Sequence, residues 1–128
     1  MILQGMKINM KIKTQDLTGV QLDWAVAECL NWEDYNEDGV PYIELDSSHM
    51  SRRFGPYKPS IDWEQAGPII ERERIELGSY ADQWQATMHL EDGSIFEHGP
   101  TPLIAAMRCY VASKLGNEIN IPEALINK

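Results

Sequence analysis

Basic residues are scarce in this chain. It has 11 Lys and Arg against 20 Asp and Glu, and its formal net charge at pH 7 is −9. Neutralising the phosphates of a nucleic acid requires clustered Lys and Arg, so this balance excludes direct, non-specific binding to DNA or RNA. An acidic chain is instead suited to a basic partner, or to mimicry of a nucleic acid.

Cysteine and long apolar runs are scarce as well. The two cysteines, Cys29 and Cys109, fall inside expected helices. We interpret them as reduced thiols in a cytoplasm rather than as a disulfide. No apolar run approaches the roughly 20 residues that a membrane-spanning helix needs, and no signal peptide is apparent. These absences predict a cytoplasmic protein that does not bind a membrane.

Catalytic motifs are also missing. The sequence has no phosphate-binding P-loop, no G-x-S-x-G motif and no Cys–His pair with a placed carboxylate. Glu71 and Glu73 are the candidates for acid–base chemistry, but a salt-bridged surface explains this pair better. We therefore expect a protein that is not an enzyme and that needs no cofactor.

The features that are present predict one α+β domain over residues 1–128. Thr101 and Pro102 begin a strongly apolar helix that Gly116 ends, and we expect this helix to be the central, buried one. Residues 83–90 and 95–98 flank an Asp92-Gly93 turn, which is typical of a β-hairpin. We expect a single layered domain with a mainly antiparallel sheet of three to five strands, packed by two or three helices.

Two further helices are predicted from their start signals. Thr18 and Gln21 fit a capping box, in which Gln21 reaches back to the amide of the capping residue. Ser60 is expected to cap a second helix that begins at Ile61. The Gly67-Pro68 pair is expected to break or kink that helix.

Two stretches stand apart from these elements. Residues 6–13 alternate between apolar and polar side chains and predict a half-buried strand. Several methionines here are candidate start residues, so residues 1–9 are expected to form an N-terminal extension. Residues 32–59 are acidic and then polar, and they contain Pro and Gly. We expect them to be a loop-rich insert.

Several long segments resemble a known family. They are LTGVQLDWAVAECLN from Leu17, PYKPSIDWEQAGPIIERERI from Pro56 and GPTPLIAAMRCYVASKLGNEINIP from Gly99. These segments resemble the NinX-like proteins of tailed phages, a family carried as a domain of unknown function. The pattern is also similar to the phage α-β-α sandwich proteins. The resemblance covers most of the chain and is weakest over residues 32–54. It implies a phage or prophage accessory protein in a bacterial cytoplasm, and it implies no known chemistry.

Two patterns suggest metal ligands, and neither is complete. Residues 34–39 match the first half of a calcium loop, but Leu45 stands where the bidentate Glu is required. We interpret this stretch as a solvated acidic loop. If the turn is Asp92-Gly93, His89 and His98 are diagonal neighbours about 7–8 Å apart on one sheet face. No third ligand is placed there, so we expect no metal site.

Arg108 is the one charge in the middle of the apolar helix. An unpaired buried guanidinium is very costly, so Arg108 must meet a carboxylate, several carbonyls or an anionic ligand. The candidate carboxylates are Asp62, Glu71 and Glu73. We expect a carboxylate of the IERER segment to hold Arg108, whose remaining donors then face a pocket beside Trp63.

Aromatic side chains and helix starts complete a candidate site for an anionic ligand. Stacking on an aromatic ring is worth about 1–3 kcal/mol per base, and the amides at a helix start donate to anions. The candidate ligand-binding residues are Tyr57, Ser60, Trp63, Arg72, Trp84, Thr101 and Arg108.

Three functional hypotheses follow from these observations. The first is a non-enzymatic phage protein that sequesters a small anionic molecule, such as a nucleotide used as a host-defence signal. The second is an acidic interaction protein, or a nucleic-acid mimic, that occupies a host protein. The third is a small hydrolase that uses Glu71 or Glu73. All three hypotheses are compatible with a homo-oligomer.

Overall fold

The computed structural model describes residues 9–46 and 53–126. These residues form an α+β fold, as the sequence predicted, with three α-helices, seven strands and two short 3-10 turns. In chain order the elements are β1 (Asn9–Lys13), η1 (Thr14–Asp16), α1 (Gly19–Cys29), β2 (Tyr42–Asp46), β3 (Arg53–Pro56), α2 (Trp63–Glu73), β4 (Glu76–Tyr80), β5 (Gln83–Leu90), β6 (Gly93–Gly99), α3 (Pro102–Leu115), β7 (Glu118–Pro122) and η2 (Glu123–Leu125).

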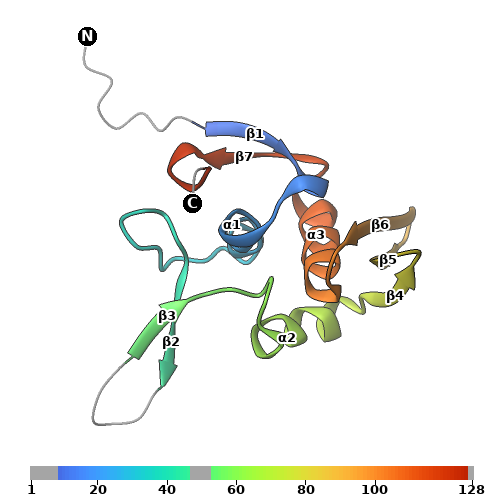
Figure 1. Ribbon diagram of the computed structural model, residues 1–128, viewed down its shortest axis with the longest axis horizontal. Coiled ribbons are helices and arrows are strands. Elements are labelled where there is room, and N and C mark those ends of the chain that lie inside the picture. Colours follow the sequence, from blue (N-terminus) through green and yellow to red (C-terminus); the bar gives the residue numbers. More distant parts are fainter. Residues whose placement is uncertain (1–8, 47–52, 127–128) are drawn as a thin grey trace.

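Helix α3 is the centre of the molecule, as predicted. The hydroxyl of Thr101 accepts a hydrogen bond from the amide of Ile104 at 3.1 Å, and Pro102 occupies the first turn. Gly116 ends the helix with φ of 90°, a conformation that favours glycine. Residues 105–112 are all buried. Figure 1 shows α1 on one side of α3 and the sheet of β4, β5 and β6 on the other.

The strands form three small antiparallel sheets rather than the single sheet expected. Strands β4, β5 and β6 form a meander, β2 pairs with β3, and the terminal strands β1 and β7 pair with each other. Helix α3 covers one face of the meander, where Ala86 and Met88 are buried. Tyr80 and Phe96 point to the other face and are more than half exposed. The arrangement therefore differs from a sheet sandwiched between helices.

The hairpin of β5 and β6 has a different register from the predicted one. The turn is formed by Glu91 and Asp92, so that Leu90 pairs with Gly93 and His89 pairs with Ser94. Gly93 follows the turn with φ of 144°, a backbone conformation that residues other than glycine rarely adopt. Because the register moves by two residues, His98 pairs with Gln85, and the predicted diagonal pairing of the two histidines is wrong.

The sequence places the start of α1 correctly, with Thr18 at the N-cap, but the predicted capping bonds there and the predicted start of α2 are wrong. Thr18 makes no side-chain capping bond; instead the side chain of Gln21 donates to the carbonyls of Leu125 and Ile126. Helix α2 is capped by Asp62, which accepts from the amide of Glu64 at 2.9 Å, rather than by Ser60. The side chain of Gln21 therefore bonds the C-terminal segment instead of the amide of Thr18 at its own helix start.

Pro68 lies inside α2 without ending it, contrary to the predicted break. Pro68 removes the bond to the carbonyl of Glu64. Both residues are exposed, so water can reach that carbonyl. The helix ends instead at Arg74, which adopts the left-handed conformation with φ of 54°.

The two stretches set apart by their sequence are only partly described. Of the expected extension, residues 1–8 lie outside the described residues, and Asn9 belongs to β1. The expected insert, residues 32–59, contains the hairpin of β2 and β3, and its residues 47–52 lie outside the described ones. Within residues 9–46 and 53–126, no helix is both long and apolar enough to cross a membrane.

Candidate functional site

Arg108 is buried in the core, where it binds main-chain carbonyls. Its Nε donates to the carbonyl of Leu17 at 2.9 Å and its Nη1 to the carbonyl of His98 at 2.8 Å. Burial lowers the pKa of Arg108, and the negative charges of Glu97 and Asp16 partly raise it again. The sequence allowed a carboxylate, several carbonyls or an anionic ligand as the partner of Arg108. The structure shows main-chain carbonyls in this role.

The prediction that a carboxylate of the IERER segment holds Arg108 is therefore wrong. The carboxylate of Glu73 lies 2.8 Å from Nε of Arg72 and 3.7 Å from Nζ of Lys114. Glu73 therefore belongs to a surface salt-bridge network, which was the preferred interpretation of the Glu71 and Glu73 pair. This pairing engages Glu73, one of the two carboxylates of the hydrolase hypothesis, in the salt-bridge network.

Tyr57 and Ser60 lie where the segment before α2 packs against α1. The ring of Tyr57 stacks on Trp32 with centroids 4.2 Å apart, and burial raises the pKa of its phenol to about 12. The amide of Ser60 donates to the carboxylate of Asp23 at 2.8 Å. The Ser60 hydroxyl is buried without a hydrogen bond in the described part of the structure. Burial of Asp23 raises its pKa to about 6.

The other candidate ligand-binding residues have separate positions. Arg72 donates to the hydroxyl of Tyr110 at 3.3 Å, and its charge also acts on the phenol of Tyr57. Trp63 and Trp84 are 56% and 38% exposed and come from α2 and β5. Thr101 uses its hydroxyl as the cap of α3. The structure thus bonds Arg72 to Tyr110, and it gives Arg108 and Thr101 structural bonds of their own.

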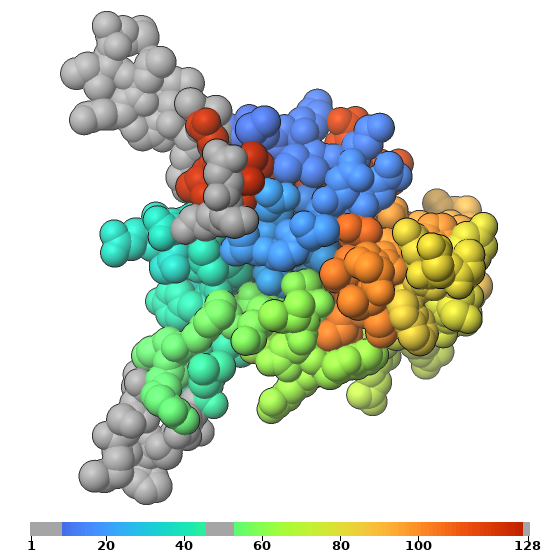
Figure 2. Space-filling model, viewed as in Figure 1, coloured from blue at the N-terminus to red at the C-terminus, as the bar shows by residue number. Residues whose placement is uncertain are grey.

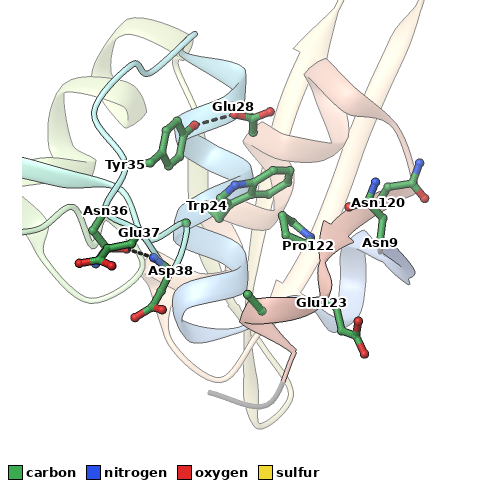
Figure 3. Close-up of a pocket in the computed structure, with 12 residues that line it drawn as sticks. Asn9, Trp24, Glu28, Tyr35, Asn36, Glu37, Asp38, Asn120, Pro122 and Glu123 are labelled. Carbon is green, nitrogen blue, oxygen red and sulfur yellow. Dashed lines mark hydrogen bonds between the residues drawn. The ribbon is translucent and has the colours of Figure 1, made fainter. Parts of the chain in front are cut away.

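A cleft of about 680 Å³ lies elsewhere, between α1, the loop that follows it and the C-terminal segment. We call it the acidic cleft. Figure 3 shows Trp24 in the middle, with Tyr35 and Glu28 to one side and Pro122 and Asn120 to the other. Its lining residues are Asn9, Trp24, Glu28, Tyr35, Asn36, Glu37, Asp38, Gly39, Asn120, Pro122, Glu123 and Ala124.

One wall of the acidic cleft is the exposed face of α1. Trp24 and Glu28 are four residues apart and therefore share a helix face, opposite the buried Leu22 and Val26. The carboxylate of Glu28 accepts a hydrogen bond from the hydroxyl of Tyr35 at 2.6 Å. Burial and this bond raise the pKa of the Tyr35 phenol. The bond ties the loop to the helix.

The loop wall is a tight turn built around Asn36. The side-chain oxygen of Asn36 accepts hydrogen bonds from the backbone amides of Asp38 and Val40, at 2.9 and 3.0 Å. The backbone amide of Asn36 donates to the carbonyl of Val40. Gly39 has φ of 85°, which suits glycine. The oxygen that a calcium loop would offer to the ion therefore binds backbone amides instead. No group of three or more potential metal ligands is present among the described residues.

The third wall comes from the C-terminal segment and is held by α1. Asn120, Pro122 and Glu123 belong to β7 and η2, and Pro122 pairs with Asn9 of β1. The side chain of Gln21 donates to the carbonyl of Leu125, the last residue of η2, at 3.2 Å and to that of Ile126 at 3.4 Å. The C-terminal segment is thus tied to α1, and β1 joins this wall through its pairing with β7.

The lining of the acidic cleft carries charge of one sign. Among its twelve residues, all within the described part of the chain, four carry carboxylates and none is Lys, Arg or His. Figure 3 shows Glu37 and Asp38 at the rim of the cleft on one side of the half-buried Trp24, and Glu123 at the rim on the other. Carboxylates around an indole face attract a cation and repel a phosphate.

The sequence contains a signal for one wall of this site. The acidic residues of the loop after α1 are interpreted from the sequence as an incomplete calcium loop. The spacing of Trp24 and Glu28 puts both on a face that the core does not use. The contribution of Asn120 and Glu123 had no such signal, because it depends on the pairing of the two terminal strands.

A comparison with protein families identifies the chain. The family model described as bacteriophage P22 NinX matches residues 13–114, which include α1, the acidic loop, α2, the meander and all but the last residue of α3. No curated protein matches the chain. The match spans most of the sequence and confirms the resemblance seen in its motifs. The chain belongs to the bacteriophage NinX family and is thus a phage accessory protein.

Proposed function

We propose that this phage accessory protein binds a basic segment of a host protein in its acidic cleft. The observation that carries the proposal is the lining of the cleft, which contains four carboxylates and Trp24 and no basic residue. A Lys or Arg side chain placed over the indole gains a cation–π contact, worth about 0.5–1 kcal/mol at an exposed site and more when desolvated. The carboxylates supply charge-assisted hydrogen bonds to the same cation.

The size and rigidity of the acidic cleft support a peptide rather than a simple ion. Its volume of about 680 Å³ holds several residues of an extended segment. Its walls are fastened by the Tyr35–Glu28 bond and by the bonds from Gln21 to the C-terminal segment. A site with fixed walls loses less conformational entropy on binding. The formal net charge of −9 adds long-range attraction for a basic partner.

A nucleotide ligand, the first hypothesis from the sequence, has less support. Phosphate groups are repelled by the carboxylates of the acidic cleft. Arg108, which was to bind the anion, already donates to two carbonyls in the core. Thr101 likewise uses its hydroxyl to cap α3. The geometry therefore favours the second hypothesis, an interaction protein, over sequestration of an anion.

The experiment is an NMR titration that follows the four tryptophan indole N–H signals. The probes are a short peptide of alternating Gly and Arg, the same peptide with neutral citrulline in place of Arg, and ATP. We expect the Arg peptide to shift the Trp24 indole, because the cation approaches its ring, whereas the Trp63 and Trp84 signals stay in place.

The controls separate this proposal from the alternatives. The citrulline peptide keeps the shape of the Arg peptide but lacks its charge, and it is expected to leave the Trp24 indole unchanged. Signals that respond equally to both peptides, or that respond to ATP alone, would overturn the proposal. A Trp24→Leu variant assigns the indole signal to its residue.

A further inference from the structure

Strand β4 is an open edge of the three-stranded sheet. It pairs with β5 on one side, and within residues 9–46 and 53–126 no strand pairs with its other side. Figure 2 shows the yellow segment around residue 80 at the margin of the molecule. An edge strand presents unpaired N–H and C=O groups, and proteins usually block such edges with Lys, Pro or a bulge. Strand β4, with the sequence ELGSY, has none of these features.

The hairpin geometry shows which groups this edge offers. Ala81 and Asp82 form a two-residue turn, and Tyr80 pairs with Gln83. In such a hairpin the residues that flank the turn form a hydrogen-bonded pair, and bonded pairs then recur at every second position. Tyr80, Gly78 and Glu76 therefore direct their backbone groups toward β5. Leu77 and Ser79 direct theirs toward the open edge.

We propose that β4 pairs with β4 of a second copy of this chain, antiparallel and centred on Gly78, to give a six-stranded sheet across a twofold axis. In this register Leu77 of each copy faces Ser79 of the other, and these are the two residues whose backbone groups point outward. Gly78 then meets Gly78 in a non-hydrogen-bonded pair, where the two strands approach most closely. A twofold interface is self-complementary, as this pairing requires.

Charge complementarity selects this register over its neighbours. Arg74 lies just before β4 and Asp82 just after it, and both are exposed. Antiparallel pairing about Gly78 brings Arg74 of one copy to the end of the strand where Asp82 of the other lies. A shift by two residues in one direction faces Glu76 with Asp82, which is repulsive. A shift in the other direction loses the pairing of Arg74 with Asp82.

Two exposed aromatic side chains adjoin the same edge. Trp84, 38% exposed, is the β5 partner of Ser79, so Leu77 of the second copy approaches it. Tyr80, 57% exposed, stands beside Glu76 of the second copy, on the face where its ring contacts His98. Pairing therefore covers apolar surface on both faces of the edge. The buried area is small, so we expect a weak, concentration-dependent dimer.

Sedimentation equilibrium of the full chain over a range of concentrations tests the proposal. We expect the mass to rise toward twice that of the monomer. Arg74→Glu and Asp82→Arg are each expected to weaken association about tenfold, because the dimer contains the pair twice. The double variant restores opposite charges and is expected to recover association. A monomer at every concentration, or a dimer that both single variants leave unchanged, would overturn the proposal.

A cysteine crosslink gives a second readout, with a matched control. A Cβ added at Gly78 or at Gly67 meets no atom within 4 Å, so both Gly78→Cys and Gly67→Cys are expected to fold. Burial raises the pKa of the native thiols Cys29 and Cys109 to about 12, which keeps them unreactive. Mild oxidation is expected to link Gly78→Cys chains much faster than Gly67→Cys chains. Equal rates for the two variants would contradict pairing about Gly78.

Discussion

Asp23 and Arg108 are the two charged side chains that the described part of the fold buries. Each is bonded to backbone groups rather than to an opposite charge: Asp23 accepts from the amide of Ser60, and Arg108 donates to the carbonyls of Leu17 and His98. The sequence showed that a buried Arg108 needs partners. It did not identify them, because carbonyls carry no signal in a side-chain pattern.

Asp23 makes the stability of the protein depend on pH. Burial raises its pKa to about 6, against an ordinary value of about 3.9. The native state therefore holds this proton more tightly than the unfolded state. The resulting stabilisation is complete below about pH 4 and is lost as the pH rises through about 6. At 1.36 kcal/mol per unit of pKa, the loss is about 2–3 kcal/mol.

An Asp23→Asn variant isolates this effect, because Asn keeps the acceptor for the Ser60 amide and stays neutral. Urea unfolding between pH 4 and pH 8 is expected to show the stability difference moving in favour of the variant, by about 2–3 kcal/mol as the pH rises. A difference that does not change with pH would contradict the assignment to Asp23.

Arg108 is expected to act on stability rather than on ligand binding. Arg108→Met leaves the carbonyls of Leu17 and His98 without their donors, at a cost of about 2–4 kcal/mol. Arg108→Lys keeps the charge but not the fork that reaches both carbonyls, so it is expected to recover only part of the loss. Chemical denaturation measures both variants. An Arg108→Lys protein of full stability that failed to bind an anion would favour the earlier ligand hypothesis.

Helix α3 illustrates when an element can be predicted from sequence. Its cap, first-turn proline, apolar body and terminal glycine all agree, and the structure has the helix where they place it. The start of α1 was predicted at the right residue but with the wrong side-chain bonds, and the start of α2 was predicted two residues too early. Gln21 and Ser60 have partners in distant segments, the C-terminal turn and Asp23, and local rules contain no information about such partners.

Met107 tests the central position of α3, because its side chain is fully buried. Met107→Asp places a carboxylate among apolar neighbours, at a cost of several kcal/mol, and is expected to prevent folding. Leu115→Asp on the same helix, at a position 42% exposed, is the control and is expected to fold. Circular dichroism during heating distinguishes the two. A Met107→Asp protein that melts cooperatively near the wild-type temperature would exclude α3 from the core.

At the scale of the whole molecule, the acidic cleft exists because distant segments meet. Helix α1, the loop after it and the paired terminal strands each contribute a wall, as Figure 3 shows. The sequence supplied the acidic composition and the idea of a basic partner. It could not supply the cleft, because the antiparallel pairing of β1 with β7 brings Asn9 and Pro122 together across most of the chain.

The central claim is that the acidic cleft binds a basic segment, and a pair of variants with equal charge tests it most directly. Glu28→Gln removes a carboxylate from the cleft and still offers an oxygen to Tyr35, whereas Glu71→Gln removes one from the exposed face of α2. Calorimetry with the Gly-Arg peptide measures the affinity of each. We expect Glu28→Gln to weaken binding about tenfold and Glu71→Gln to leave it nearly unchanged. Equal losses in the two variants would show that overall charge, and not the acidic cleft, attracts the peptide.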